Sequence, residues 1–188
     1  LVRREAGPLR GWTTISLLRA ERKLPDPNVE SWEDLPPAVT YPPVFDRRMD
    51  IDLVVQYEAP RGVELGLRWN FGSPLPYTRP MAQYFAWRYS PQRGRYESLD
   101  QPGDDPPVYV RLGDRNSERY PPYHRLDLTV RRRFERSWGS WTPYLQVLNA
   151  YNRRNVLWYF YNYDKTPPSR SGLSMFPVLP AVGVEMSF

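Results

Sequence analysis

The stretch from Met49 to Phe71 alternates apolar and polar residues over two runs that are separated by a short break. Apolar residues occupy every second position from Met49 to Tyr57, and the pattern restarts at Val63 after the segment EAPRG. A period of two places successive side chains on opposite faces of a strand. The stretch therefore predicts a β-hairpin with one apolar and one polar face.

The same pattern predicts an all-β chain of six long antiparallel strands and an N-terminal stub. The stub covers residues 1–5, and the long strands cover 12–21, 45–58, 63–72, 123–134, 141–152 and 176–188. Prolines gather between these runs and argue against further central strands there. The aromatic first half of segment 153–175 is read as a possible continuation of the fifth strand beyond the sheet.

The predicted connections alternate strictly between short and long. A soluble sandwich has no reason to keep every second loop short, because both of its ends face water. A barrel of an outer membrane has short turns at one end and long loops at the other. We therefore expect an antiparallel transmembrane β-barrel segment.

Three features favour lipid over a protein core as the neighbour of the apolar face. The strands are about ten residues long, which suits a tilted membrane crossing. Aromatic residues gather near strand ends, where interfacial girdles lie: Trp12, Tyr57, Trp69, Phe71, Phe134, Trp141 and Tyr151. The polar face carries charges in mid-strand, which we expect to face an aqueous lumen and to form a ladder of ion pairs: Asp50, Asp52, Arg68, Arg125, Asp127 and Arg131.

Composition excludes several other classes. The 188 residues suffice for one sizeable domain, and 22 prolines stand beside 15% aromatic residues, which argue against simple disorder. The absence of cysteine excludes disulfides and thiolate metal sites. The formal charge of +5 is spread along the chain without a basic block, so we expect no nucleic-acid partner. No apolar run approaches a spanning helix, and the first residues lack the features of a signal peptide, so we expect a fragment of a longer protein.

Candidate catalytic and metal-binding residues are few. His124 is the single histidine and lacks a neighbouring carboxylate motif, so we expect a structural role. The segment DQPGDD (100–105) lacks the spacing of a calcium loop and is interpreted as a solvated turn. The segment RRRFER (131–136) is interpreted as an interfacial anchor at the short-turn end. No catalytic triad can be assembled, so we expect neither an enzyme nor a cofactor.

Ligand contacts are expected from aromatic residues of the long connections, because aromatic rings supply rigid contact area at low entropic cost. The same residues could instead pack the connections against one another. The candidates are Trp32, Tyr41, Tyr77, Tyr84, Trp87, Tyr96, Tyr109, Trp158, Phe160 and Tyr161.

Four stretches, in this order along the chain, resemble consecutive pieces of one known barrel. They are FDRRMDIDLVVQYEAPRGVELGLRWNFGSPLPYT, YPPYHRLDLTVRRRF, YLQVLNAYNRRNV and FPVLPAVGVEMSF. Together they resemble the C-terminal part of the β-barrel of a TonB-dependent outer-membrane receptor. The last strand, with its terminal Phe188, resembles the insertion signal that the barrel-assembly machinery recognises.

The resemblance implies a 22-stranded barrel in the outer membrane of a Gram-negative-type envelope. Residues 1–188 would be the C-terminal portion of that barrel, without the plug domain and the remaining strands. Such a receptor imports a scarce small-molecule ligand, such as a metal chelate, a vitamin or a glycan, with energy from TonB acting through the plug. The resemblance also implies that the outer surface of the barrel contacts outer-membrane lipid.

Two other readings of the residues remain open. One is a soluble β-barrel or sandwich that holds an apolar ligand, with the stripe from Met49 to Tyr57 shielded from solvent. The other is a separately encoded piece that completes a split barrel with another chain. Both keep the all-β fold but change the expected mass and solubility.

Overall fold

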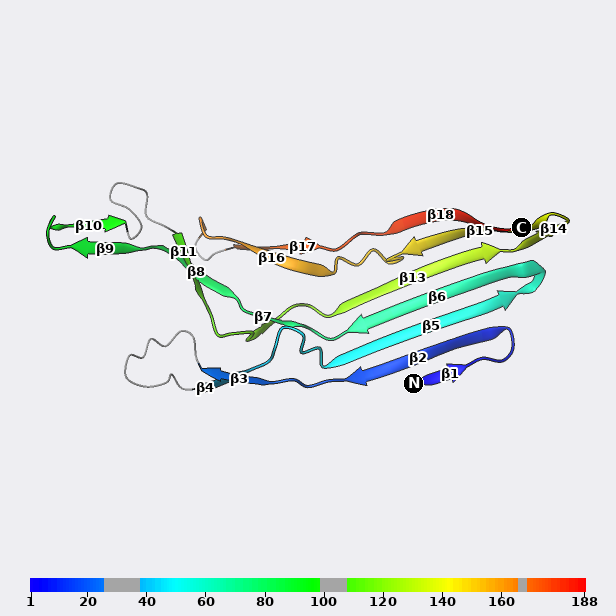
Figure 1. The fold of residues 1–188 in the computed structure, drawn as a ribbon, viewed down its shortest axis with the longest axis horizontal. Helices are drawn as coiled ribbons and strands as arrows, with labels where there is room; N and C mark the ends of the chain where they lie inside the picture. Colours follow the sequence, from blue (N-terminus) through cyan, green and yellow to red (C-terminus); the bar gives the residue numbers. More distant parts are fainter. Residues whose placement is uncertain (26–37, 99–107, 166–168) are drawn as a thin grey trace.

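A computed structural model describes residues 1–25, 38–98, 108–165 and 169–188, and almost all of them belong to strands and turns. The principal feature is one antiparallel sheet of eight strands (Figure 1). Its strands are β1 (Val2–Arg4), β2 (Leu9–Leu17), β5 (Met49–Ala59), β6 (Val63–Gly72), β13 (Tyr123–Arg132), β14 (Phe134–Arg136), β15 (Gly139–Leu148) and β18 (Leu179–Ser187). The expected all-β antiparallel fold is confirmed.

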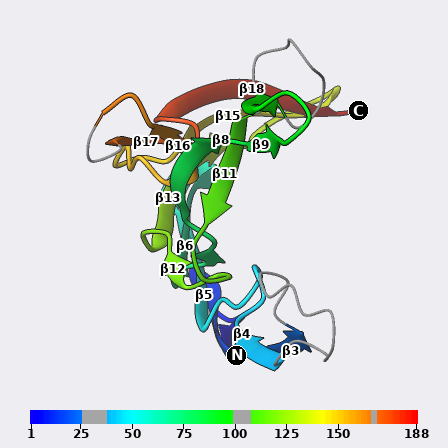
Figure 2. The same ribbon diagram turned by 90° about the vertical axis from the view of Figure 1, so that its left-hand side faces the viewer.

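The sheet is an open, curved meander. Each strand pairs with the next long strand along the chain, from β1 at one edge to β18 at the other. Figure 2 shows the sheet as an arc. Within the described part of the chain, β1 pairs only with β2 and β18 only with β15, so no closed barrel forms. The expected strands are present, but they make an arc with two free edges.

Strands β13 and β14 are one strand in constant register that is interrupted by a proline on its neighbour. Arg131 is paired with Tyr144 and Phe134 with Trp141, so Pro143 stands opposite Arg132. Proline has no N–H to donate, and the ladder between the two strands is broken at this point. The predicted strand 123–134 therefore appears as two.

The long connections are β-ribbons, which the sequence did not predict. All of them lie at one end of the sheet, opposite the short turns (Figure 1). The ribbons pair β3 (Arg22–Pro25) with β4 (Ala38–Tyr41), β7 (Pro76–Tyr77) with β12 (Glu118–Arg119), β8 (Pro80–Phe85) with β11 (Val108–Leu112), β9 (Trp87–Ser90) with β10 (Arg95–Ser98), and β16 (Val156–Asn162) with β17 (Ser169–Ser174). At the other end, the 3₁₀ turn η1 (Pro60–Gly62) joins β5 to β6, with positive φ at Arg61 and Gly62.

Two expectations about the sheet are wrong. The fifth strand ends at Leu148 and does not continue into β16, because Asn149 and Asn152 adopt positive φ angles of 53° and 54° that break an extended chain. Trp12 was expected near a strand end, but it is the fourth of the nine residues of β2 and pairs with Val54, on the face opposite to Tyr57, Trp69 and Phe71.

The buried residues are mainly polar, which is the reverse of the pattern in a water-soluble domain. Among the described residues, only Tyr41 and Tyr77 are buried hydrophobics, whereas buried polar residues include Asp46, Asp127 and Asn149. The accessible surface is 14286 Å². A compact monomer of this mass exposes about 9,400 Å². The sheet thus leaves its apolar face largely uncovered.

Candidate functional site

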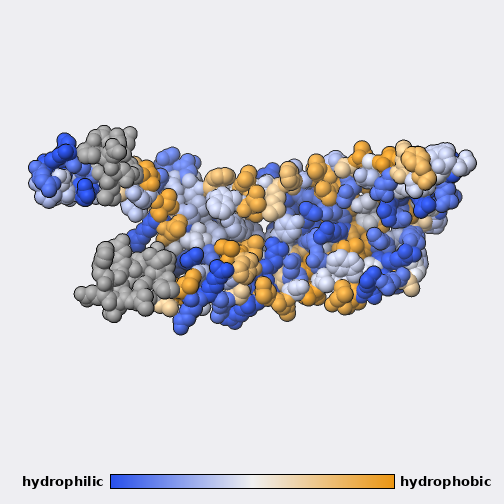
Figure 3. Space-filling model, in the orientation of Figure 1, coloured by the Kyte–Doolittle hydropathy of each residue, from blue (hydrophilic) through white to orange (hydrophobic). Residues whose placement is uncertain are grey.

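The polar face of the sheet gathers the charged residues of the central strands. The strand register places on this one face Asp50, Asp52, Arg68, Arg125, Asp127 and Arg131. The opposite face carries Leu53, Leu67 and Leu128 at adjoining positions. Figure 3 views the polar face, where hydrophilic residues gather over the middle of the sheet.

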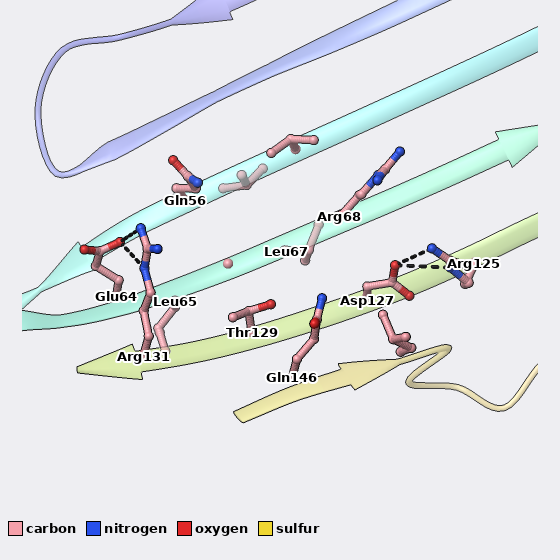
Figure 4. A pocket seen from close by; sticks show the side chains of 14 residues that line it. Gln56, Glu64, Leu65, Leu67, Arg68, Arg125, Asp127, Thr129, Arg131 and Gln146 are labelled. Atoms are coloured by element: carbon pink, nitrogen blue, oxygen red, sulfur yellow. Dashed lines mark hydrogen bonds and ion pairs between the residues drawn. The ribbon is translucent and has the colours of Figure 1, made fainter. Parts of the chain in front are cut away.

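The ion pairs on this face join other partners than those of the expected ladder. Arg125 donates from Nε and Nη2 to the same oxygen of Asp127, at 3.1 and 2.8 Å, within one strand. Arg131 donates across strands to Glu64, at 2.8 and 2.6 Å (Figure 4). Glu64 was not among the charged residues expected to form ion pairs, although its even position in β6 shares the parity of Arg68.

The remaining expected ladder residues pair differently. Asp52 accepts a hydrogen bond from Asn70 on the neighbouring strand, and Asp50 lies 3.6 Å from Arg47. Arg68 bonds to no residue in the part of the chain that the structure describes, and Figure 4 shows it without a partner.

The polar face is hollowed between β5, β6, β13 and β15. The hollow has a volume of about 290 Å³, and its polar lining includes Gln56, Glu64, Arg68, Arg125, Asp127, Thr129, Arg131 and Gln146. Gly66 lies at its floor, where an added Cβ would stand 3.4 Å from Cβ of Thr129. Three arginines against two carboxylates give the lining an excess of positive charge, which suits solutes rich in oxygen acceptors.

Asp46 joins the first long connection to the second. Its carboxylate is fully buried and accepts hydrogen bonds from Nη2 of Arg119 at 2.7 Å and from the backbone N–H of Ala20 at 3.0 Å. Burial alone would raise the pKa of Asp46, but the bonds from Ala20, Arg119 and Arg48 outweigh it and hold that pKa below its usual range. Asp46 is therefore a charged structural anchor.

A cluster of tyrosines joins the second connection to the third. Tyr120 stacks on Tyr159 with ring centroids 5.3 Å apart, and Tyr77 lies 4.4 Å from Tyr120. Arg170 lies over the ring of Tyr159 and donates to the hydroxyl of Tyr77 at 3.0 Å. Burial raises the pKa of Tyr77, and its bond to Tyr161 adds to that rise. The cluster is packed and hydrogen-bonded, which indicates a structural contact.

The aromatic ligand candidates do not converge on one site. Tyr41, Tyr77 and Tyr161 take part in contacts between connections, and Tyr84 stacks on Tyr109 within its own ribbon. The exposed candidates lie on separate ribbons: Tyr84 and Tyr109 on β8–β11, Trp87 and Tyr96 on β9–β10, and Trp158 and Phe160 on β16. Trp32 and the segment 100–105 lie outside the described residues.

His124 lies at the connection end of the apolar face. Its Nδ1 is 2.6 Å from the hydroxyl of Tyr151, with the rings 5.4 Å apart. Within residues 1–25, 38–98, 108–165 and 169–188, no group of three or more carboxylate or histidine side chains is placed to hold a metal ion. In the same ranges, no helix has the length and apolar character needed to span a bilayer.

Comparisons with known proteins identify no relative. No family model matches the sequence, and neither the curated proteins nor the solved structures yield a match. Any function must therefore be argued from the residues and their geometry.

Proposed function

We propose that this chain is part of the transmembrane β-barrel of an outer-membrane receptor of the TonB-dependent type, which takes up a scarce small-molecule ligand. The observation that carries the proposal is the placement of polarity across the sheet. The apolar face is exposed, with Val182 at 80% and Ile15 at 63%, while the opposite face is hollowed and charged. This is the polarity of a wall between lipid and a wet lumen.

The two ends of the apolar face support a membrane span. His124 and Phe71 are paired at the connection end, and Phe134 and Trp141 are paired at the short-turn end. Ten residues of strand extend about 33 Å, and a tilt of about 40° reduces that to about 25 Å. This height matches the apolar band of outer-membrane barrels, with aromatic residues at both of its limits.

The free edges of β1 and β18 support a barrel larger than this chain. An unpaired strand edge cannot be left in lipid, because its N–H and C=O groups would lack partners. Further strands would close the barrel, and a plug domain would make the contact with TonB. The soluble alternative predicts a shielded stripe from Met49 to Tyr57, yet no residue of β5 is buried. The split-barrel alternative differs only in where the other strands are encoded.

Site-directed labelling tests the membrane assignment and its orientation. Residues 1–188 contain no cysteine, so single substitutions give defined labelling sites in this region. Gln92→Cys lies in the turn of the outermost ribbon, and Ser137→Cys lies in the turn between β14 and β15; both positions are exposed. In intact cells, an impermeant maleimide should label the first variant and should reach the second only after permeabilisation.

Fractionation of the native protein complements the labelling. An antibody to this segment should detect an outer-membrane band several times heavier than 22.2 kDa. A soluble band near that mass, or equal labelling of both variants in intact cells, would overturn the proposal. A membrane band near that mass with a copurifying partner would replace the receptor by the split barrel.

A further inference from the structure

A second cavity lies where the polar face meets the third long connection. It has a volume of about 510 Å³, within the usual range of small-molecule sites. It is lined by residues of β13, β15 and β18, by the adjacent ends of β16 and β17, and by the segments next to those ends. Its apolar wall includes Leu148, Leu157, Met175, Phe176 and Leu179, and its polar wall includes Arg125.

The apolar wall is unusual for its position. Leu148 and Leu179 are paired across β15 and β18 on the face whose central positions are mainly polar. Phe176 is 82% exposed and Leu157 is 54% exposed, although both border the same cavity. Exposed apolar side chains that converge on one concave site mark a binding surface.

Asparagines hold this wall in a defined position. The amide of Asn149 donates to the backbone oxygen of Phe176 at 3.1 Å, and Oδ1 of Asn152 accepts from the N–H of Val178 at 3.1 Å. The backbone of Asn155 accepts from the N–H of Met175 at 2.7 Å. The backbone from 175 to 178 is thus fixed while its side chains project, which lowers the entropic cost of binding.

Arg125 adds a cationic group at the other side of the cavity. Both of its bonds to Asp127 use Nε and Nη2, so its Nη1 donors bond to no residue of the described chain. The contact with Asp127 therefore leaves the Nη1 donors of Arg125 unused. A carboxylate or similar anionic group is the partner that a guanidinium fork prefers.

We propose that this cavity binds an amphipathic organic anion, with an aromatic or hydrocarbon body against Leu148, Phe176 and Leu179 and an anionic group at Arg125. The inference rests on the proposed uptake function, since it names the chemical class of ligand that such a receptor would take. The hollow around Arg68 shares Arg125 and Leu148 with this cavity, but Phe176 and Leu179 line only the cavity.

Calorimetric titration of the intact, detergent-solubilised protein tests the cavity with two matched probes. The anion 2-naphthoate and the neutral 2-naphthamide have nearly the same size and shape, and titration into protein-free micelles corrects for partitioning. Because a hydrogen bond to a charged group carries the difference, 2-naphthoate should bind about tenfold to a hundredfold more tightly than the amide. Arg125→Gln should abolish this preference.

Arg68→Gln is the matched control, because it removes the same charge from the same face on a neighbouring strand outside the cavity. It should leave the preference unchanged. Phe176→Ala removes an exposed side chain without disturbing packing and should weaken both probes about threefold to tenfold. This variant keeps the test decisive if Arg125→Gln does not fold.

Several results would overturn the inference. These are binding of neither probe, equal binding of both, an unaltered affinity in Phe176→Ala, or an equal loss in the two arginine variants. Titration of purified protein reports on the cavity alone, whereas labelling of intact cells reports on insertion and orientation. Failure of the ligand class and failure of the proposed function are therefore distinguishable.

Discussion

A pair of arginine substitutions on one strand measures what the apolar face touches. Leu128 and Thr129 are adjacent in β13 and project to opposite faces, with Leu128 among Leu67 and Val147 and Thr129 in the polar hollow. Leu128→Arg and Thr129→Arg therefore introduce the same side chain at the same height. The difference between their effects on the free energy of unfolding therefore reports the environment of each face, because the effect of arginine on the strand itself is common to both variants.

The magnitude follows from the depth of Leu128. It lies four residues from His124 and six from Phe134, or about 13 and 20 Å along the strand, near the middle of the proposed span. Arginine on the lipid side costs about 2–4 kcal/mol of unfolding free energy at mid-membrane. Leu128 is 39% exposed, so in water the same change would stay within about 0.5 kcal/mol. Thr129→Arg should also remain within about 1 kcal/mol, because the hollow is wet.

The assay is equilibrium unfolding of the whole protein by guanidinium in lipid vesicles, followed by tryptophan fluorescence. Arginine scanned along the apolar side of β6 at Val63, Leu65, Leu67 and Trp69 should give a cost that peaks near Leu67 and declines towards the ends. Equal costs for Leu128→Arg and Thr129→Arg would refute a lipid-facing assignment. A cost at Leu67 without the decline along β6 would instead indicate a protein core.

Three further changes test the contacts between elements. Asp46→Asn should lower the free energy of unfolding by about 2–3 kcal/mol, because it leaves the guanidinium of Arg119 without its carboxylate partner. Backbone hydrogen exchange should become faster in the first and second long connections. Because folding lowers the pKa of Asp46, its contribution is present above its ordinary pKa of about 4 and is lost only in stronger acid, so protection that disappears at pH 6 would contradict this role. Tyr77→Phe removes the acceptor of Arg170 and should cost about 1 kcal/mol, with faster exchange in β16 and β17; unchanged exchange would exclude a link. Phe188→Ala should slow assembly-machinery-dependent insertion without lowering folded stability, since Phe188 is 93% exposed, and normal insertion kinetics would remove it as the signal.

Period-two alternation predicted the sheet because each long strand has two chemically different faces. The range 63–72 agrees with β6, and the alternation of short and long connections is present throughout. The predicted end of the fifth strand was less accurate. Asn149 and Asn152 adopt a left-handed backbone conformation that ends the strand, although the sequence pattern there still predicts an extended chain. Asparagine is enriched at positive φ and depleted in strands, so these two residues carried a local turn signal that the apolar alternation of the run outweighed in the prediction.

The ribbons and the contacts between connections could not be predicted from local patterns. β9 and β10 have four residues each and pair tyrosine with tyrosine, which gives no clear alternation. Asp46 and Arg119 are separated by 73 residues, so only the folded chain brings them together. Pairing of charges at such separation depends on loop paths, and many arginines compete as partners in the sequence.

The contacts through Asp46 and the tyrosine cluster have a consequence for engineering. The three long connections meet one another at sites away from the long strands, so they constitute one cap on a separate scaffold. Grafting a single connection from another protein would break buried contacts at its neighbours. A chimera that exchanges all three together would keep those contacts, and the scaffold would need change only at the junctions.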